Sequence, residues 1–336
     1  MVNGIVVVGA SAGGVEALRS LVGGLPADLP AAVVVVLHIP RRAPSALPAI
    51  LDRSGVLPAV SAEQGLPLRD GVIYTAPADR HVLVTRNHLH LSLGPTENGH
   101  RPAIDPLFRS AAAEFGPRCI GVVLSGTRDD GTAGLAAIAE RGGAALVQEP
   151  ADALYGAMPS SALAHVPAAT RYPADKMGVA LAEMLRDGPA GSGVEPVNDR
   201  LAGENGIAAM TAAPDATVDL AGARPAGLTC PSCDGVLFEL PGEPAPRFRC
   251  RIGHAWSPDS LTAEQGIEAE DALWVAVRVL EERAALLTHL ADHAEHRGQH
   301  HTALGRRRRA AEAGEQASTV RALIADGVAA GGELPG

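Results

Sequence analysis

The sequence is poor in aromatic residues and in cysteine, and it has no long hydrophobic run. Aromatic residues make up 3% of its 336 residues, so the core must be built mainly from small and branched aliphatic side chains. Four cysteines are too few for a disulfide scaffold of this size, which favours a reducing compartment. The longest apolar run, residues 31–37, is far too short to cross a bilayer, and no signal peptide is recognisable. These absences predict a cytoplasmic protein that does not insert into a membrane.

The chain also lacks an excess of positive charge. Its formal net charge is -10, so no nucleic-acid partner is expected. The one basic run, residues 306–309, lies among Glu, Ala and His and is interpreted as a solvated helix face. The histidines at positions 289, 293 and 296 have a spacing that metal sites use, but nothing singles out a further ligand. A solvated face is therefore the favoured interpretation there as well.

The first half of the chain does contain a regular alternation of strand-like and helix-like segments. Continuous valine runs such as residues 33–36 are typical of strands buried on both faces. Their alternation with helices predicts an α/β fold with a doubly wound, mostly parallel sheet. Shorter strand-like segments within residues 72–93 indicate an inserted hairpin.

A change of composition near residue 188 ends this alternation. A Gly-, Pro- and Ala-rich stretch follows, then a cysteine-containing segment, and then apolar residues at helical spacing, which indicate an α-helical hairpin. The predicted division is an α/β domain over residues 1–188, a flexible linker over 189–226, a small metal-binding module over 227–258 and a helical hairpin over 259–330. Because the first strand begins within the first few residues, no receiver-like domain is expected before it.

Polar residues follow three of the predicted strands. Ser11 lies in a Gly-Ala-Ser-Ala-Gly turn that fits the G-x-S-x-G nucleophile pattern, and His38 and the pair Asp129 and Asp130 follow two other strands. The carboxyl ends of parallel strands meet at one edge of a sheet, where functional residues gather. An imidazole can take the proton of a serine hydroxyl, and a carboxylate can orient that imidazole. The three positions therefore indicate a nucleophile, a base and an orienting group.

Each of these residues also has a structural interpretation. The glycine-rich turn could serve packing or phosphate binding, His38 could be an ordinary loop residue, and either aspartate could cap the helix predicted at Thr132. Their joint occurrence at three strand ends favours the catalytic hypothesis. The chain order Ser, His, Asp argues against a standard lipase or esterase of the α/β-hydrolase type, where the order is Ser, Asp, His.

Five motifs, in this order, resemble the catalytic domain of the chemotaxis protein-glutamate methylesterase family, CheB. They are Gly-Ala-Ser-Ala-Gly-Gly (9–14), His-Ile-Pro (38–40), His-Arg-Pro-Ala-Ile-Asp (100–105), Leu-Ser-Gly-Thr-Arg-Asp-Asp-Gly (124–131) and Tyr-Gly-Ala-Met-Pro (155–159). The resemblance spans about residues 4–185 and implies a parallel doubly wound fold. It also implies that Ser11 is the nucleophile, His38 the general base and Asp130 the orienting carboxylate.

The resemblance implies a serine hydrolase that cleaves γ-glutamyl methyl esters, and can deamidate glutamines, on the cytoplasmic helices of chemoreceptors. No cofactor is needed for this chemistry. Backbone N–H groups near Ala12 and Thr127 are expected to hold the oxyanion. His100 and Arg101 are expected either to shape the substrate cleft or to serve structure. Two alternatives remain open, namely a small-molecule carboxylesterase or amidase on the same fold, and a non-catalytic module that binds a ligand.

The chain departs from the family pattern in three respects. It shows no receiver domain, has Ala12 where a small hydroxyl residue is often found, and has Ser-Gly-Thr-Arg (125–128) where Thr-Gly-Met-Gly is frequent. The predicted triad is unaffected by these changes. With no receiver domain expected, control by phosphorylation within the chain is not expected either, and the resemblance supports the chemistry more directly than the receptor substrate.

The cysteine-containing segment has the pattern C-x2-C-x16-C-x3-H, formed by Cys230, Cys233, Cys250 and His254. One Cys3His set is the right ligand number for a closed, structural zinc site. The alternative is that His254 only packs and that the cysteines are redox-active or inert. Metal ligation would supply much of the folding energy of so small a module. It resembles zinc-ribbon-like tails of some standalone family members, and with the hairpin it is a candidate for partner docking or self-association, with Trp256 and Trp274 as aromatic anchors.

Overall fold

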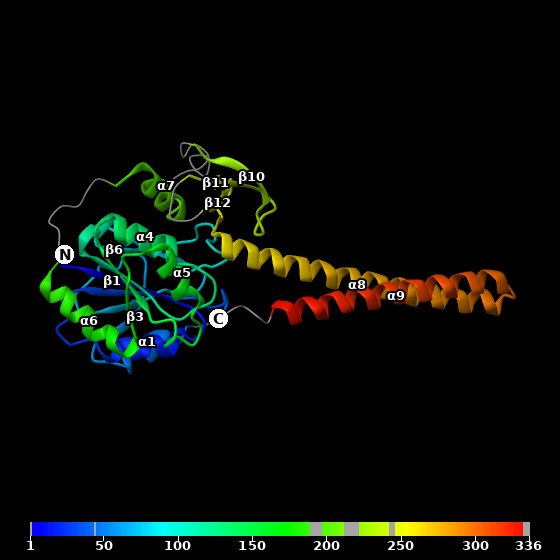
Figure 1. Cartoon of the computed structure of the whole chain (residues 1–336), viewed down its shortest axis with the longest axis horizontal. Helices are drawn as coiled ribbons and strands as arrows, with labels where there is room; N and C mark the ends of the chain where they lie inside the picture. The colour runs from blue at the N-terminus through cyan, green and yellow to red at the C-terminus, as the bar shows by residue number, and fades with distance from the viewer. Residues whose placement is uncertain (1, 44, 189–196, 212–221, 242–245, 332–336) are drawn as a thin grey trace. The chain divides into compact units, whose positions relative to one another are not determined.

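The computed structural model describes residues 2–43, 45–188, 197–211, 222–241 and 246–331 (Figure 1). The chain divides into two compact units, Met1–Leu261 and Thr262–Gly336. Among the described helices, none is both long and apolar enough to span a membrane.

Seven parallel strands form the central sheet of the first unit, which confirms the predicted α/β class. Their spatial order is β3-β4-β2-β1-β7-β8-β9. The bounds are β1 (Ile5–Ala10), β2 (Ala32–Leu37), β3 (Ala59–Ser61), β4 (Ile73–Thr75), β7 (Cys119–Val123), β8 (Ala144–Gln148) and β9 (Thr170–Tyr172). The chain moves outward from β1 through β2 to β3 and β4 and then returns to β7. The reversal between β1 and β7 is a topological switch point, where doubly wound sheets place their ligands.

Helices cover both faces of the sheet (Figure 1), because successive strand side chains point to opposite faces. Val6 and Val8 of β1 pack with α1 (Gly14–Gly23), α2 (Leu47–Asp52) and α6 (Ala174–Asp187). Ile5 and Val7 pack with the helices of the opposite face, α3 (Ile104–Phe115), α4 (Thr132–Glu140) and α5 (Ala157–His165). The two faces of one valine-rich strand therefore anchor both helical layers.

The predicted hairpin is present over β5 (His81–Thr85) and β6 (His88–Ser92), which pair antiparallel. Arg86 and Asn87 form its two-residue turn with φ values of 48° and 62°. Two positive φ values give the twist that tight hairpins require. Residues 73–75, at the start of the predicted region, instead join the main sheet as β4.

Part of the segment expected to be a flexible linker is a helix. α7 (Asp199–Ala208) begins at Asn198, whose side-chain oxygen accepts a hydrogen bond from the Leu201 N–H at 2.8 Å. Leu201 and Ile207 are buried, and the side chain of Asn205 donates to the carbonyl of Arg109 in α3. The linker prediction is therefore wrong for residues 199–208, where tertiary contacts stabilise a segment whose own periodicity is weak. The predicted linker residues 189–196 and 212–221 lie outside the described residues.

The cysteine-containing module is a four-stranded antiparallel sheet. Its strands, in spatial order, are β10 (Arg224–Thr229), β11 (Val236–Leu240), β12 (Arg247–Cys250) and β13 (Ala255–Trp256). Leu237, Trp256 and Leu261 form its small apolar core together with two of the cysteines. Such a core is too small to hold four short strands without further support.

Two long helices form the predicted C-terminal hairpin. α8 (Pro258–His296) and α9 (His300–Gly331) run side by side in opposite directions (Figure 1). Small residues such as Ala294 and Ala310 are buried along the pair, and Arg321 of α9 bonds to Glu281 of α8 at 2.6 Å. The exact boundaries predicted for the α/β domain, the linker, the metal-binding module and the hairpin stay predictions.

Candidate active site and metal centre

Ser11 lies at the switch point, directly after β1 and before α1. Its N–H donates to the carbonyl of Ser125 at 2.9 Å, which ties it to the loop after β7. Gly13 caps α1 with a φ of 69°, and a Cβ there would lie 2.8 Å from both the Leu154 Cβ and the Ser125 Oγ. This turn therefore needs glycine, and it presents the Ser11 hydroxyl, which is partly exposed, near a helix N-terminus.

His38 follows β2, and its ring connects Ser11 to Asp130. Its Nδ1 lies 3.2 Å from the Ser11 Oγ, and its Nε2 lies 2.8 Å from the Asp130 Oδ2. A neutral imidazole that donates its Nε2–H to the carboxylate presents the Nδ1 lone pair to the hydroxyl. The structure thus brings Ser11, His38 and Asp130 from three strand ends into one hydrogen-bonded chain. A serine, an imidazole and a carboxylate in this order can activate a hydroxyl as a nucleophile.

The carboxylate of Asp130 is buried among hydrogen-bond donors. Its Oδ2 also accepts the N–H of Ile104, at the start of α3, at 2.7 Å. Its Oδ1 accepts the Nδ2–H of Asn98 at 2.9 Å. Although burial opposes its charge, the hydrogen bonds donated by the His38 ring and the Ile104 N–H hold the pKa of Asp130 well below its usual range. Asp130 is therefore a carboxylate fixed in one orientation.

Asp129, the other aspartate considered from the sequence, faces different partners. Its Oδ1 accepts the hydroxyl protons of Ser257 at 2.6 Å and Ser260 at 2.7 Å. Burial raises the pKa of Asp129, against the effect of these two donors. Adjacent aspartates thus have separate roles in the structure, one beside His38 and one beside the start of α8.

His100 stacks on His38, with ring centroids 3.7 Å apart and an interplanar angle of 14°. Burial, together with the neighbouring His38, lowers the pKa of His100 to about 3. Arg101 is held away from the rings: its guanidinium donates to Asp79 at 2.7 Å and to the carbonyls of Leu93 and Gly94. The structure therefore places His100 at the site, and it gives Arg101 partners that tie its loop to the β5–β6 hairpin.

The loops that carry Ala12 and Thr127 are bound to each other. The Ser125 Oγ donates to the carbonyl of Ala12 at 2.8 Å and accepts the N–H of Tyr155 at 3.0 Å. A Cβ on Gly126 would lie 2.9 Å from the Ser11 Cβ, so this position must be glycine for the loop to approach the serine. Leu154 and Tyr155 lie on the loop before α5, with 71% and 46% of their surfaces exposed. The site thus has an exposed apolar border.

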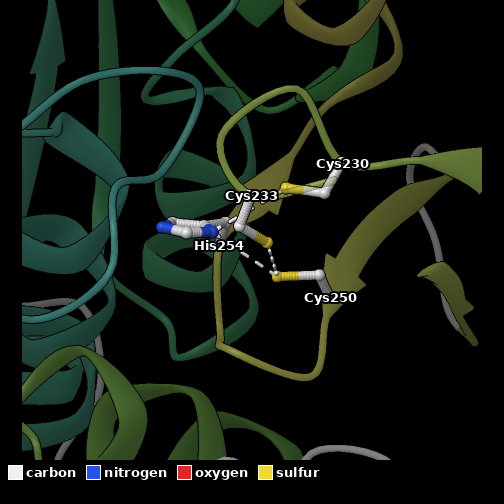
Figure 2. A group of neighbouring side chains, drawn as sticks. All are labelled: Cys230, Cys233, Cys250 and His254. Atoms are coloured by element: carbon white, nitrogen blue, oxygen red, sulfur yellow. Dashed lines mark hydrogen bonds between the residues drawn. The ribbon is translucent and has the colours of Figure 1, made fainter. Parts of the chain in front are cut away.

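Cys230, Cys233, Cys250 and His254 converge in the cysteine-containing module (Figure 2). Their ligand atoms all lie within 4.8 Å of one another, and this is the metal-ligating group found among the described residues. The Cys233 and Cys250 Sγ atoms are 3.6 Å apart, and the Cys250 Sγ lies 3.5 Å from the His254 Nδ1. A tetrahedral site with Zn–S bonds of about 2.3 Å has ligand separations of about 3.8 Å. The four residues could therefore hold a metal ion, as the spacing predicted.

A buried charge cluster, which the sequence does not predict, lies where the module contacts the α/β domain. Glu97 accepts from Arg109 of α3 at 2.7 Å and from Arg249 of β12 at 3.4 Å. Glu204 of α7 bonds to Arg247 at 2.5 Å and also contacts Arg109 and Arg249. No sequence motif marks these residues, because they come from four separate segments that only the fold brings together.

Comparison with known proteins agrees with the motifs. The family model described as CheB methylesterase matches residues 6–191. A protein-glutamate methylesterase/protein-glutamine glutaminase 2 from Methanosarcina mazei is 35% identical over 193 residues, covering 55% of this chain and 53% of that protein. The protein of the same name from Anaeromyxobacter dehalogenans is 37% identical over 182 residues, covering 54% of this chain and 53% of its own. The chain spans about half the length of these curated relatives.

A solved structure shows the same fold. The crystal structure of the Thermotoga maritima CheB methylesterase catalytic domain superposes with a TM-score of 0.52 at 30% sequence identity. The match covers 55% of this chain and 99% of that domain. The similarity is thus to a whole catalytic domain, and it accounts for a little more than half of this chain.

Proposed function

Because the chain belongs to the CheB methylesterase family, we propose that it hydrolyses γ-glutamyl methyl esters of a protein, and deamidates glutamines, through Ser11, His38 and Asp130. The observation that carries the proposal is the position of the His38 ring, with one nitrogen 3.2 Å from the Ser11 hydroxyl and the other 2.8 Å from Asp130. This is the arrangement that makes a serine hydroxyl nucleophilic.

The reaction proceeds in two steps. The Ser11 Oγ attacks the ester carbonyl carbon while the His38 Nδ1 takes its proton, and Asp130 stabilises the resulting imidazolium. Backbone N–H groups at Ala12 and Thr127 stabilise the oxyanion. His38 then protonates the departing methoxide, which leaves as methanol and gives an acyl-enzyme. Water, deprotonated by His38, attacks the acyl carbon, and collapse of this second intermediate returns the proton to Ser11 and releases the glutamate.

A protein substrate fits the surface around the serine. Leu154 and Tyr155 expose apolar side chains next to the turn that carries Ser11, and an apolar border can contact a helix that presents the esterified side chain. The methylated cytoplasmic helices of a chemoreceptor, which the family resemblance implies, are the proposed partner. A contact between such a helix and Leu154 would favour this substrate over a small ester.

The metal centre is proposed to be structural zinc. Three cysteines and one histidine leave no open coordination position, so the ion stabilises the module and takes no part in ester hydrolysis. Docking or self-association through the C-terminal helices stays a prediction.

The esterase proposal is tested with a fluorophosphonate probe, which reacts with activated serines. Labelling of the full chain is expected at Ser11, lost in Ser11→Ala and strongly reduced in His38→Ala. Release of methanol from a methylated chemoreceptor, with little hydrolysis of generic small esters, would support the protein substrate. The reverse preference would show a small-molecule esterase, and absence of labelling in a folded protein would show that the α/β domain is a binding module.

A further inference from the structure

Asn98 joins the proposed catalytic carboxylate to the metal-binding module. Its Nδ2 donates to the Asp130 Oδ1 at 2.9 Å and to the Asp105 Oδ2 at 3.2 Å. Its Oδ1 accepts the N–H of Ser257 at 2.8 Å, and the residue is only 2% exposed. One buried amide therefore contacts the carboxylate that orients His38 on one side and the end of the module on the other.

We propose that Asn98 is a positioning residue for Asp130, held in place by the metal-binding module, so that metal occupancy sets the rate of ester hydrolysis. This inference rests on the proposed function of the site. It adds a regulatory role to the module, because loss of the metal would act on the reaction through Asn98.

The backbone of residues 96–98 is hydrogen-bonded to the segment that follows the ligand His254. The Asn98 N–H donates to the carbonyl of Ala255 at 2.8 Å, and the Ala255 N–H donates to the carbonyl of Thr96 at 3.2 Å. Ala255 is adjacent to His254, and Ser257 is three residues beyond it. A displacement of His254 on loss of the metal would therefore be transmitted to both the backbone and the side chain of Asn98.

The conformation of Asn98 makes it dependent on these contacts. Its φ of 53° lies in the left-handed region, which residues other than glycine adopt at an energetic cost. The hydrogen bond that its N–H donates to the Ala255 carbonyl and the one that its Oδ1 accepts from the Ser257 N–H hold it there, with its amide directed at Asp130. Without them, Asn98 can relax toward ordinary backbone angles and withdraw its donor from the carboxylate.

The module transmits the state of the metal centre because its core includes the metal ligands. Trp256, between Ala255 and Ser257, is 2% exposed, and its indole N–H donates to the Cys230 Sγ at 3.4 Å. Cys230 and Cys250 are themselves part of the small apolar core. In small metal-binding modules the binding free energy is largely folding free energy, so removal of the metal loosens the strands.

Buried ion pairs hold strand β12 of the module against the α/β domain while the metal is bound. Glu97, which precedes Asn98, pairs with Arg109 of α3 and with Arg249, the residue before the ligand Cys250. Glu97 and both arginines are at most 2% exposed in these pairs. A shift of β12 would leave the buried charge of Glu97 less well paired, so the contact is coupled to the position of Cys250.

The test combines metal removal with the substitution Asn98→Gly in the full chain. Glycine accepts the positive φ and keeps the backbone N–H that binds Ala255, so only the amide side chain is lost. With zinc bound, kcat is expected to fall by about tenfold to a hundredfold with little change in KM, as for a misplaced catalytic group. Chelation of zinc from the wild-type chain is expected to lower kcat by a similar factor, and zinc addition to restore it. In Asn98→Gly, chelation is expected to have little further effect.

The control is Thr96→Val, an isosteric change two residues away. It removes a hydroxyl that lies 3.4 Å from the Ser232 Oγ of the module but has no contact with Asp130. It should keep both the wild-type kcat and its dependence on zinc. If chelation lowers kcat equally in wild type and Asn98→Gly, the module acts only through general stability and the inference is wrong, because coupled changes must be non-additive.

A second readout does not depend on turnover. The proton between the His38 Nε2 and the Asp130 Oδ2 is followed by NMR in the same proteins. Its resonance should shift when zinc is removed from the wild-type chain, and it should be insensitive to zinc in Asn98→Gly. If Ser11 proves unreactive while this pattern is present, the esterase proposal fails and the coupling stands. If Ser11 reacts but the resonance does not shift on removal of zinc, the proposed coupling is wrong and the esterase proposal stands.

Discussion

At the residue scale, the site depends on which oxygen of each carboxylate meets which donor. Four N–H groups of the described residues donate to Asp130, namely those of the His38 ring, the Asn98 amide and the backbone of Ile104 and Asp105. Each carboxylate oxygen accepts from two of these groups, Oδ2 from His38 and Ile104 and Oδ1 from Asn98 and Asp105. Asp129, one residue earlier, serves Ser257 and Ser260 instead. The strand-end pattern left both aspartates as candidates and the family resemblance implied Asp130, and the 2.8 Å distance places Asp130 beside the imidazole.

Replacement of Asp130 by asparagine tests this assignment. At the Oδ2 position an amide N–H₂ would face the His38 Nε2–H, so His38 would have to change tautomer and present Nδ1–H to Ser11. At the Oδ1 position it would face the Asn98 N–H₂ and displace the donor that holds the side chain in place. We expect Asp130→Asn to lower kcat by about 10³-fold to 10⁴-fold in a folded protein. Asp129→Asn keeps the Oδ1 that accepts both serine hydroxyls, and it should lower kcat far less. Equal losses in the two variants would show that Asp130 is not the orienting carboxylate.

His100 makes stability depend on pH. Its pKa is about 3 in the folded chain and near 6.5 in an unfolded one, so the unfolded chain binds the extra proton between these values. The contribution of His100 is therefore fully present above pH 6.5 and is lost as the pH falls toward 3. In His100→Phe, which keeps a flat ring against His38, the free energy of unfolding should fall less between pH 7 and pH 5, by up to about 2 kcal/mol. Urea denaturation at the two pH values measures this, and parallel losses in both proteins would contradict it.

At the scale of elements, α7 shows how tertiary contacts can stabilise a helix that local sequence does not predict. Glu204 places one carboxylate among Arg109, Arg247 and Arg249. Although burial opposes its charge, Arg247 and Arg109 hold the pKa of Glu204 well below its usual range. The helix is therefore attached to both the α/β domain and the module through one buried anion.

The substitution Glu204→Gln should detach α7. It leaves Arg109, Arg247 and Arg249 without the carboxylate that all three contact, and an unpaired buried charge costs about 3–5 kcal/mol. Hydrogen exchange of the α7 amides should become much faster while that of β1 changes little. Glu282→Gln is the matched control, because Glu282 pairs with Arg278 on an exposed helix surface and such pairs contribute about 1 kcal/mol or less. Unchanged protection of α7 in Glu204→Gln would refute the role of this anion.

At the scale of the whole molecule, the chain combines a complete α/β domain with a module whose core is too small to be stable alone. The sheet is buried under helices on both faces, whereas the module's core is a few apolar side chains and three cysteines. The two parts should therefore respond differently to removal of the metal, even though they are joined by Asn98 and the buried charge cluster.

Chelation should unfold the module and spare the α/β domain. We expect purified protein to contain one zinc per chain, and hydrogen exchange after chelation to rise across residues 224–256 while β1 and β7 stay protected. Added zinc should restore protection, since metal binding supplies the folding free energy of such modules. Protein that carries no zinc after careful purification, or a module that stays protected without it, would rule out the structural metal.

Patterns in the sequence were enough for the α/β class, the hairpin at residues 81–92, the antiparallel helices and the convergence of the Cys3His set. Each follows from local periodicity or from spacing along the chain, which a sequence records directly. The tertiary structure alone decided that residues 199–208 form a helix, that Asp129 meets Ser257 and Ser260, and that Asn98 lies between the Cys3His module and the Asp130 carboxylate. These features depend on contacts between segments far apart in the chain. Buried polar groups are stabilised by partners from other segments, and no short stretch of sequence records which partner each group will meet.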